Sequence, residues 1–229
     1  MLTLAMESSA KPASVAICSD GALLGQYYQN NGLTHSRTLL AMLDSLLKNL
    51  DVAMSDIEQI AVASGPGSFT GVRIGVSAAK GLAWGLDIPI CGVSTLEAIA
   101  YQNPGQDSIV CPVMDARRNQ VYNALFQWRE GSLIRIRNDR AIALDELADD
   151  LTTLNEPILL VGDGAEISYT HLIRTMSDIH MAHSLARYQS AYGVALAAAN
   201  NEPISAIELE PRYLRPSQAE QKLGQSRTG

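Results

Sequence analysis

The chain reads Ser64-Gly65-Pro66-Gly67-Ser68-Phe69-Thr70-Gly71-Val72-Arg73-Ile74-Gly75 between an apolar run and an alanine-rich segment. The apolar run, residues 57–63, is typical of a strand in a parallel sheet. The segment that follows, up to about residue 86, predicts a helix with little side-chain bulk. Glycines at such a junction permit a tight turn, and amides at a helix N-terminus can hold an anion. The turn matches neither the Walker A nor the Rossmann spacing. Anion binding and close packing both stay open, and the small side chains favour packing.

The residues before this turn predict three strands and a helix. Apolar runs at 2–7, 13–18 and 22–29 predict the strands, with Asp20-Gly21 as a hairpin turn between the last two. Leucines at helical spacing over 39–50 predict the helix, with Thr34 or Ser36 as its cap. A further strand at 88–93 leads into a helix that begins at Ser94-Thr95. The order is βββαβαβα.

The order of elements then starts again. Strands are expected at 108–115, 120–128, 133–137 and 158–161, with helices at 144–154 and 191–200, and residues 171–183 are interpreted as loop-like. The first strand of each half ends in Met-acid, as Met6-Glu7 and Met114-Asp115. These features predict a duplicated α/β protein with two mixed sheets flanked by helices. We expect an N-terminal subdomain at 1–101 and a smaller one at 102–204. Residues 205–220 can pack back on the first subdomain, and 216–229 form a flexible tail.

Composition excludes several classes of protein. The chain has 229 residues, a formal charge of −7 and 47% hydrophobic residues. An acidic chain does not hold nucleic acid alone through a broad basic surface. The arginines of the second half form a modest cluster that is interpreted as solvated surface: Arg117, Arg118, Arg135, Arg137 and Arg140. No signal peptide and no bilayer-spanning run is visible, so a cytoplasmic location is expected.

Acids and glycines at strand ends outline a candidate nucleotide site, intact or vestigial. Glu7 could position a metal-bound water beside a phosphate, or it could close a strand end. Asp115-Ala116-Arg117-Arg118 repeats the geometry, or it forms an internal salt bridge. The candidate residues are Glu7, Ser8, Ser9, Gly67, Ser68, Asp115, Gly162 and Gly164. An active site here would make the chain an ATPase or phosphotransferase. No metal site is expected, since His180-x-x-His183 has no carboxylate at a suitable spacing.

The glycine-rich turn, taken with three later motifs, resembles the bacterial TsaB (YeaZ) family over nearly the whole chain. Those motifs are Gly92-Val93-Ser94-Thr95-Leu96, Asp115-Ala116-Arg117 with Val121-Tyr122, and Pro211-Arg212-Tyr213-Leu214-Arg215. The resemblance implies the actin-like (ASKHA), duplicated ribonuclease-H-type fold. It also implies a role in making threonylcarbamoyladenosine in tRNA.

The resemblance further implies a scaffold subunit without a cofactor. Such a subunit pairs with the catalytic paralogue TsaD, is joined by the ATPase TsaE, and forms homodimers through much the same N-terminal surface. It contacts tRNA only through the complex, and it contacts no membrane. The expected interface residues are His35, Leu39, Met42, Leu43, Leu46, Val72, Arg73, Gly75, Val76, Ala79, Lys80 and Ala83. We expect Gly75→Arg or Ala79→Arg to block pairing and to leave the monomer folded.

Two departures from the related sequences favour a subunit without catalysis. The family commonly has Asp where this chain has Glu7. TsaD carries a His-x-x-x-His metal pair, and the aligned positions here are Thr95 and Ile99, neither of which is a useful metal ligand.

Overall fold

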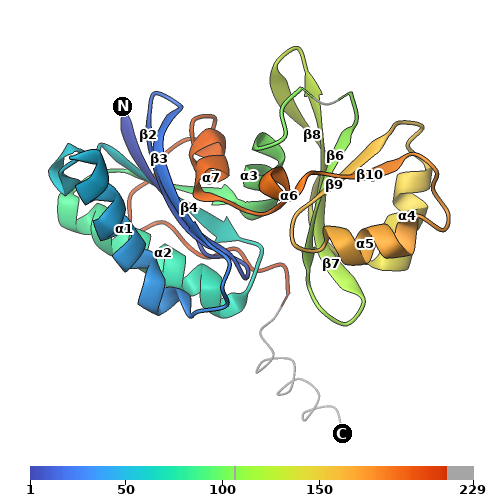
Figure 1. The fold of residues 1–229 in the computed structure, drawn as a ribbon, viewed down its shortest axis with the longest axis horizontal. Helices are drawn as coiled ribbons and strands as arrows, with labels where there is room; N and C mark the ends of the chain where they lie inside the picture. Colours follow the sequence, from blue (N-terminus) through green and yellow to red (C-terminus); the bar gives the residue numbers. More distant parts are fainter. Residues whose placement is uncertain (106, 216–229) are drawn as a thin grey trace, which may run out of the picture.

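The computed structural model describes residues 1–105 and 107–215. It places two five-stranded mixed sheets beside each other, each flanked by helices (Figure 1). The two mixed sheets predicted from the order of elements are confirmed.

The first sheet has the strand order β3-β2-β1-β4-β5. Its strands are β1 (Leu2–Glu7), β2 (Ala13–Ser19), β3 (Ala22–Gln29), β4 (Gln59–Gly65) and β5 (Ile90–Ser94). The hairpin strands β1, β2 and β3 pair antiparallel, whereas β4 and β5 add in parallel beside β1. The parallel strands therefore end at the same edge as β1, where the glycine-rich turn begins.

Helices α1 (His35–Leu50) and α2 (Phe69–Leu86) cover one face of this sheet. A short 3-10 turn, η1 (Met54–Asp56), leads from α1 toward β4. Leu39, Leu43, Leu46 and Leu47 of α1 and the valines of α2 are buried against the sheet, as helical spacing predicts, whereas Leu40 is exposed. Thr34 occupies the N-cap of α1 without a side-chain hydrogen bond. Ser94, by contrast, caps α3 (Thr95–Tyr101) by accepting from the Glu97 amide.

The second sheet repeats the first, with the order β10-β9-β6-β7-β8. Its strands are β6 (Ile109–Asp115), β7 (Gln120–Arg129), β8 (Ser132–Ala143), β9 (Ile158–Val161) and β10 (Ile179–Met181). Helices α4 (Leu144–Thr152) and α5 (Ala165–Leu172) cover one face of it. Each strand and each of these helices has a counterpart in the first half, and β6 corresponds to β1.

Two parts of the second half differ from the sequence prediction. Helix α7 (Ala191–Ala198), expected to belong to the subdomain at 102–204, packs its alanines against the first sheet instead. The loop-like region at 171–183 contains the end of α5 and all of β10, and α6 (Ser184–Arg187) follows it. These elements are too short to show a clear periodicity.

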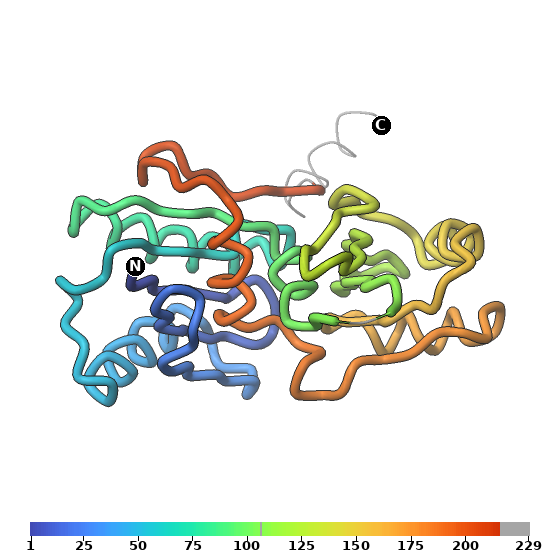
Figure 2. The backbone as a smooth tube through the Cα atoms, turned by 90° about the horizontal axis from the view of Figure 1, so that it is seen from above, coloured from blue at the N-terminus to red at the C-terminus, as the bar shows by residue number. Residues whose placement is uncertain are grey.

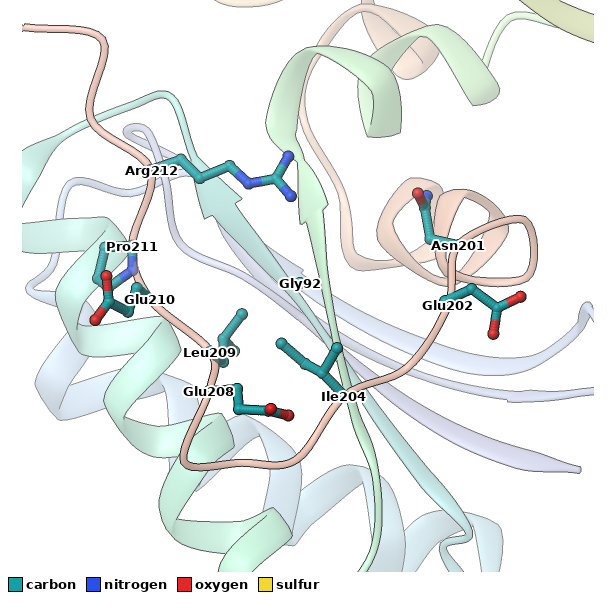
Figure 3. Close-up of a pocket in the computed structure, with 9 residues that line it drawn as sticks. All are labelled: Gly92, Asn201, Glu202, Ile204, Glu208, Leu209, Glu210, Pro211 and Arg212. Carbon is teal, nitrogen blue, oxygen red and sulfur yellow. The ribbon is translucent and has the colours of Figure 1, made fainter.

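Residues 204–215, called the strap from here on, run back over the first half. Ile204 bridges to Ile90, Leu209 is buried in the first core, and the Arg212 amide donates to the Ser64 carbonyl at 2.6 Å. Figure 2 shows this red segment crossing the first half and ending beside the second. The strap, residues 201–202 and Gly92 of β5 line a hollow of about 370 Å³. Figure 3 shows the residues that line it. The predicted tail at 216–229 lies outside the described residues. Within the described part of the chain, no helix is both long and apolar enough to cross a membrane.

Candidate functional site

A cleft with a volume of about 950 Å³ lies where the two halves meet. Four segments supply most of its lining: the loop after β1, the turn before α2, the turn after β6, and the end of the strap. The lining residues are Ser9, Ala10, Lys11, Gly67, Ser68, Phe69, Thr70, Met114, Asp115, Ala116, Arg117, Arg118, Tyr122, Asp163, Arg212, Tyr213, Leu214 and Arg215. The segments that follow β1 and β6, the corresponding first strands of the two halves, thus line the same cleft.

Glu7 ends β1 behind this lining and has no exposed surface. Its Oε1 accepts a hydrogen bond from the Ser9 amide at 2.5 Å, and its Oε2 has no hydrogen-bond partner. Burial raises the pKa of Glu7 to about 7, and the nearby Asp163 adds to the rise. Near neutral pH this carboxyl is therefore only partly ionised.

The glycine-rich turn packs against the loop after β1. A Cβ at Gly67 would collide with the Ser9 carbonyl oxygen, so only glycine fits. The Ser68 amide donates to that same carbonyl at 2.6 Å, and the Ser68 hydroxyl accepts from the Gly71 amide at 3.3 Å. Because the Ser68 amide donates this hydrogen bond within the chain, it is not free to bind an anion. The geometry favours the close-packing interpretation of this turn.

The corresponding turn of the second half is closed in the same way. Gly162 has a φ of +99°, and its amide donates to the Arg187 carbonyl at 2.6 Å. The Gly164 amide donates to the Val113 carbonyl at 3.0 Å. Asp163 accepts from the Gln189 side chain, and burial, with Asp115 nearby, raises the pKa of Asp163. Neither turn presents these amides to a phosphate.

The predicted nucleotide-site residues therefore gather around one cleft without forming a phosphate cradle. Ser9, Gly67, Ser68 and Asp115 line it, while Glu7, Ser8, Gly162 and Gly164 lie behind the lining. Asp115 accepts from the Arg117 amide at 2.7 Å and forms no ion pair with either neighbouring arginine side chain. The internal salt bridge considered for this motif is not formed.

The described residues contain no group of three or more His, Cys, Asp or Glu side chains that could hold a metal ion. Thr95 and Ile99, which align with the metal pair of TsaD, are both fully buried. His180, at 2.9 Å from Asp178, is an exposed residue of β10.

The sequence prediction found only part of the cleft's positive charge. It named Arg117 and Arg118 as part of a basic cluster and quoted Arg212 and Arg215 only within a family motif. It did not name Lys11, which comes from a distant segment of the chain. The duplication could have placed Lys11 near Arg117, since the two residues follow corresponding strands.

The other arginines of the predicted cluster are not a solvated surface. They are partly buried in ion pairs: Arg135 with Asp139 of the same strand and with Glu97 of α3, and Arg137 and Arg140 with Asp150 of α4.

Most of the predicted partner-interface side chains belong to the protein's own core. Nine of the twelve are buried: Leu39, Met42, Leu43, Leu46, Val72, Gly75, Val76, Ala79 and Ala83. A Cβ at Gly75 would collide with the Ser8 hydroxyl, and Ala79 has no exposed surface. The expectation that Arg at either position leaves the monomer folded is therefore wrong, because the guanidinium would enter the core.

The other three residues already have intramolecular partners. His35 Nε2 donates to the Ala10 carbonyl at 2.7 Å. Arg73 lies over the Phe69 ring at 3.9 Å and donates to the Tyr213 hydroxyl at 2.8 Å. Lys80 donates to the Leu209 carbonyl of the strap at 2.7 Å.

The outward faces of α1 and α2 are exposed, and the predicted interface residues did not include most of their side chains. Part of these outward faces, called the α1–α2 face, carries small and apolar side chains: Leu40, Ala41 and Ser45 on α1, and Ile74, Ser77, Ala78, Gly81 and Trp84 on α2. Charged side chains are exposed beside them: Arg37, Asp44 and Lys48 on α1, and Arg73 on α2. Leu40 is 51% exposed and Trp84 is 76% exposed. A Cβ at Gly81 would meet no atom within 4 Å. The two helices lie side by side on the outside of the first half (Figure 1).

Comparisons with known proteins identify relatives of this chain. A family model described as TsaD, tRNA N6-adenosine threonylcarbamoyltransferase, matches residues 31–220. The tRNA threonylcarbamoyladenosine biosynthesis protein TsaB of Bacillus subtilis is 33% identical over 97% of both chains. The chain belongs to the TsaB/YeaZ family. The crystal structure of YeaZ from Pseudomonas aeruginosa, at 27% identity, covers 93% of this chain and 99% of its own, with a TM-score of 0.78.

A more distant structure shows the fold alone. Component A of (R)-2-hydroxyglutaryl-CoA dehydratase from Acidaminococcus fermentans superposes with a TM-score of 0.52 at 12% identity. It covers 87% of this chain and 97% of its own. The TsaB/YeaZ chain has the actin-like, duplicated ribonuclease-H-type fold that its resemblance implied. Its family membership places it in the biosynthesis of threonylcarbamoyladenosine in tRNA.

Proposed function

We propose that this chain is a non-catalytic subunit of a cytoplasmic tRNA threonylcarbamoyltransferase complex. It pairs with a TsaD-type catalytic paralogue, and a TsaE-type ATPase joins the pair. The complex transfers the threonylcarbamoyl group to N6 of adenosine 37 in tRNAs that read codons beginning with A. Membership in the TsaB/YeaZ family supports the pathway, and the two arguments below support the role within it.

The α1–α2 face is the observation that carries the proposal. Small side chains at Ala78 and Gly81 allow a partner helix to approach closely, and Leu40 and Ile74 supply apolar area. Burying such area stabilises association by roughly 25 cal/mol per Å². The same face serves for pairing with a second copy of the chain, so homodimer and heterodimer exclude each other.

The state of the cleft supports a role without catalysis. The amides of Ser68, Gly162 and Gly164 are bonded to the protein's own carbonyls, which leaves a nucleotide phosphate without that cradle. The positions that hold metal in the catalytic paralogue are the buried Thr95 and Ile99. These features support the subunit role over the ATPase alternative.

Gly81→Arg tests the pairing surface. The added side chain meets no atom of the monomer and replaces a helical glycine, so the monomer is expected to keep its melting temperature. Across an interface the same side chain prevents close approach, and we expect loss of co-purification with a TsaD-type partner. The matched control is Thr170→Arg, an exposed site on α5, which is the counterpart of α2 in the second half.

Size-exclusion chromatography of the purified variants gives the homodimer result in the same experiment. Reconstitution of tRNA modification from this chain, the TsaD-type subunit, the TsaE-type ATPase, tRNA and substrates, omitting one component at a time, tests the role itself. Pairing that survives Gly81→Arg argues against the α1–α2 face. Modification that proceeds without this chain argues against the whole proposal.

A further inference from the structure

The cleft carries positive charge in a chain whose formal charge is −7. Five cationic residues line it: Lys11, Arg117, Arg118, Arg212 and Arg215. Arg212 also lines the hollow between the strap and β5 (Figure 3). Only two acidic residues line the cleft, Asp115 and Asp163. Asp163 also accepts a hydrogen bond from Gln189. A positive cleft on an otherwise acidic protein concentrates anions at this one place.

The five cations have no acidic partners in the described part of the chain. No ion pair involves any of them there, and Arg215 donates instead to the carbonyl of Ala116 at 3.1 Å. Lys11, Arg117, Arg118 and Arg212 are exposed. Cations that form no ion pair remain available to an anionic ligand. Their energy falls when an anionic ligand enters, which distinguishes them from the paired arginines of β8.

Aromatic rings stand among these cations. Phe69, Tyr122 and Tyr213 line the same cleft. Phe69 and Tyr213 stack with their centroids 4.6 Å apart, and this stack joins the turn before α2 to the strap. Cations that follow a backbone, together with rings that accept stacked bases, are the combination that single-stranded nucleic acid requires.

The placement of the cations favours an extended polyanion over a mononucleotide. They come from three separate segments, after β1, after β6 and at the end of the strap. No single loop of the cleft therefore holds them. The turns that would cradle a triphosphate are closed by their own hydrogen bonds.

We propose that this cleft binds a single-stranded segment of the substrate RNA while the chain is held in its complex. Lys11, Arg117, Arg118 and Arg212 contact successive phosphates, and Tyr122 or the Phe69–Tyr213 pair stacks on unpaired bases. This inference rests on the proposed function, because the pairing subunit brings the RNA to the cleft. The chain then contributes to RNA affinity and not to pairing alone.

The test uses the reconstituted complex of this chain with its TsaD-type partner and a fluorescently labelled, unmodified tRNA transcript. In the variant Lys11→Gln/Arg117→Gln/Arg118→Gln we expect affinity to fall on the order of tenfold at physiological salt. The slope of log affinity against log salt is expected to become shallower by about two, since each phosphate contact to a single strand contributes about 0.7. Arg174→Gln, an exposed arginine between α5 and β10, is the matched control and should change neither quantity.

Pairing is measured first, by size-exclusion chromatography, so that failure of either proposal can be recognised. If the wild-type chain does not pair, the proposed function fails. If the triple variant pairs and binds tRNA with unchanged affinity and salt slope, the RNA site is overturned and the proposed function stands. A calorimetric titration with ATP adds a second arm. A triple variant that loses ATP binding but keeps tRNA binding would show a mononucleotide site and overturn the RNA proposal.

Discussion

Folding buries the carboxyl group of Glu7 and satisfies only one of its two oxygens. Oε1 accepts a hydrogen bond from the Ser9 amide, and Oε2 has no hydrogen-bond partner. The pKa of this carboxyl rises from an ordinary 4.5 to about 7 through burial. As pH rises above 4.5, the unfolded chain releases this proton before the folded chain does. Stability therefore falls between about pH 4.5 and pH 7 on account of this one group.

Glu7→Gln is expected to remove that pH dependence. Glutamine keeps an oxygen for the Ser9 amide and cannot ionise. The free energy of unfolding of the variant should equal that of the wild type near pH 4.5. From there to pH 7 the variant should become the more stable protein, by about 3 kcal/mol at the upper limit that the pKa shift allows. Thermal unfolding of both proteins at several pH values measures the difference. Curves that stay parallel from pH 4.5 to pH 8 would contradict the assignment.

At the scale of single residues, the sequence predicted which residues lie around the cleft, but not whether their amides are free to bind a ligand. Acids after apolar strands, and glycines before helices, were correctly placed around one cleft. That the Ser68 and Gly164 amides are already bonded depends on the approach of loops more than 40 residues away in sequence. Spacing along the chain carries no information about such an approach.

Helix α2 shows why most of the predicted interface side chains are buried in the structure. Its residues are almost uniformly small and apolar, so periodicity predicts a helix without telling its two faces apart. Choosing the valines and Ala79 selected the face that packs on the sheet. The exposed face carries Ser77, Gly81 and Gly85 and gives little hydrophobic signal.

The two faces of α2 respond oppositely to one added methyl group. A Cβ at Gly71 would collide with the Ser8 carbonyl oxygen, whereas a Cβ at Gly81 meets open space. We expect Gly71→Ala to lower the free energy of unfolding by about 1–3 kcal/mol through overpacking. Gly81→Ala should raise it by about 0.5–1 kcal/mol through helix propensity. Urea unfolding of the two variants measures both values, and shifts of the same sign would contradict this account of the helix.

At the scale of the whole molecule, the repeated order of elements predicted the duplication, and the matching strand orders of the two sheets bear it out. The position of α7 could not be predicted in that way. It follows the second half in sequence, yet its alanines complete a layer of small residues on the first sheet. Complementarity between a helix and a sheet distant in sequence decides that packing.

Helices α3 and α7 link the two halves, and this contact predicts how the chain unfolds. Helix α3 packs on the second sheet through Leu96 and Ile99, while α7 packs on the first. The helices touch at Gly193, where a Cβ would collide with the Ala98 carbonyl oxygen.

We therefore expect the wild type to unfold in one calorimetric transition. Gly193→Ala should lower stability by about 1–3 kcal/mol and make the calorimetric enthalpy exceed the van't Hoff enthalpy, because the halves then melt separately. Gly131→Ala, at a hairpin glycine with no neighbour within 4 Å and a φ of +78°, is the control: it strains one turn without touching the contact between the halves. If this control also splits the transition, or if Gly193→Ala still unfolds in one step, α3 and α7 are not the link.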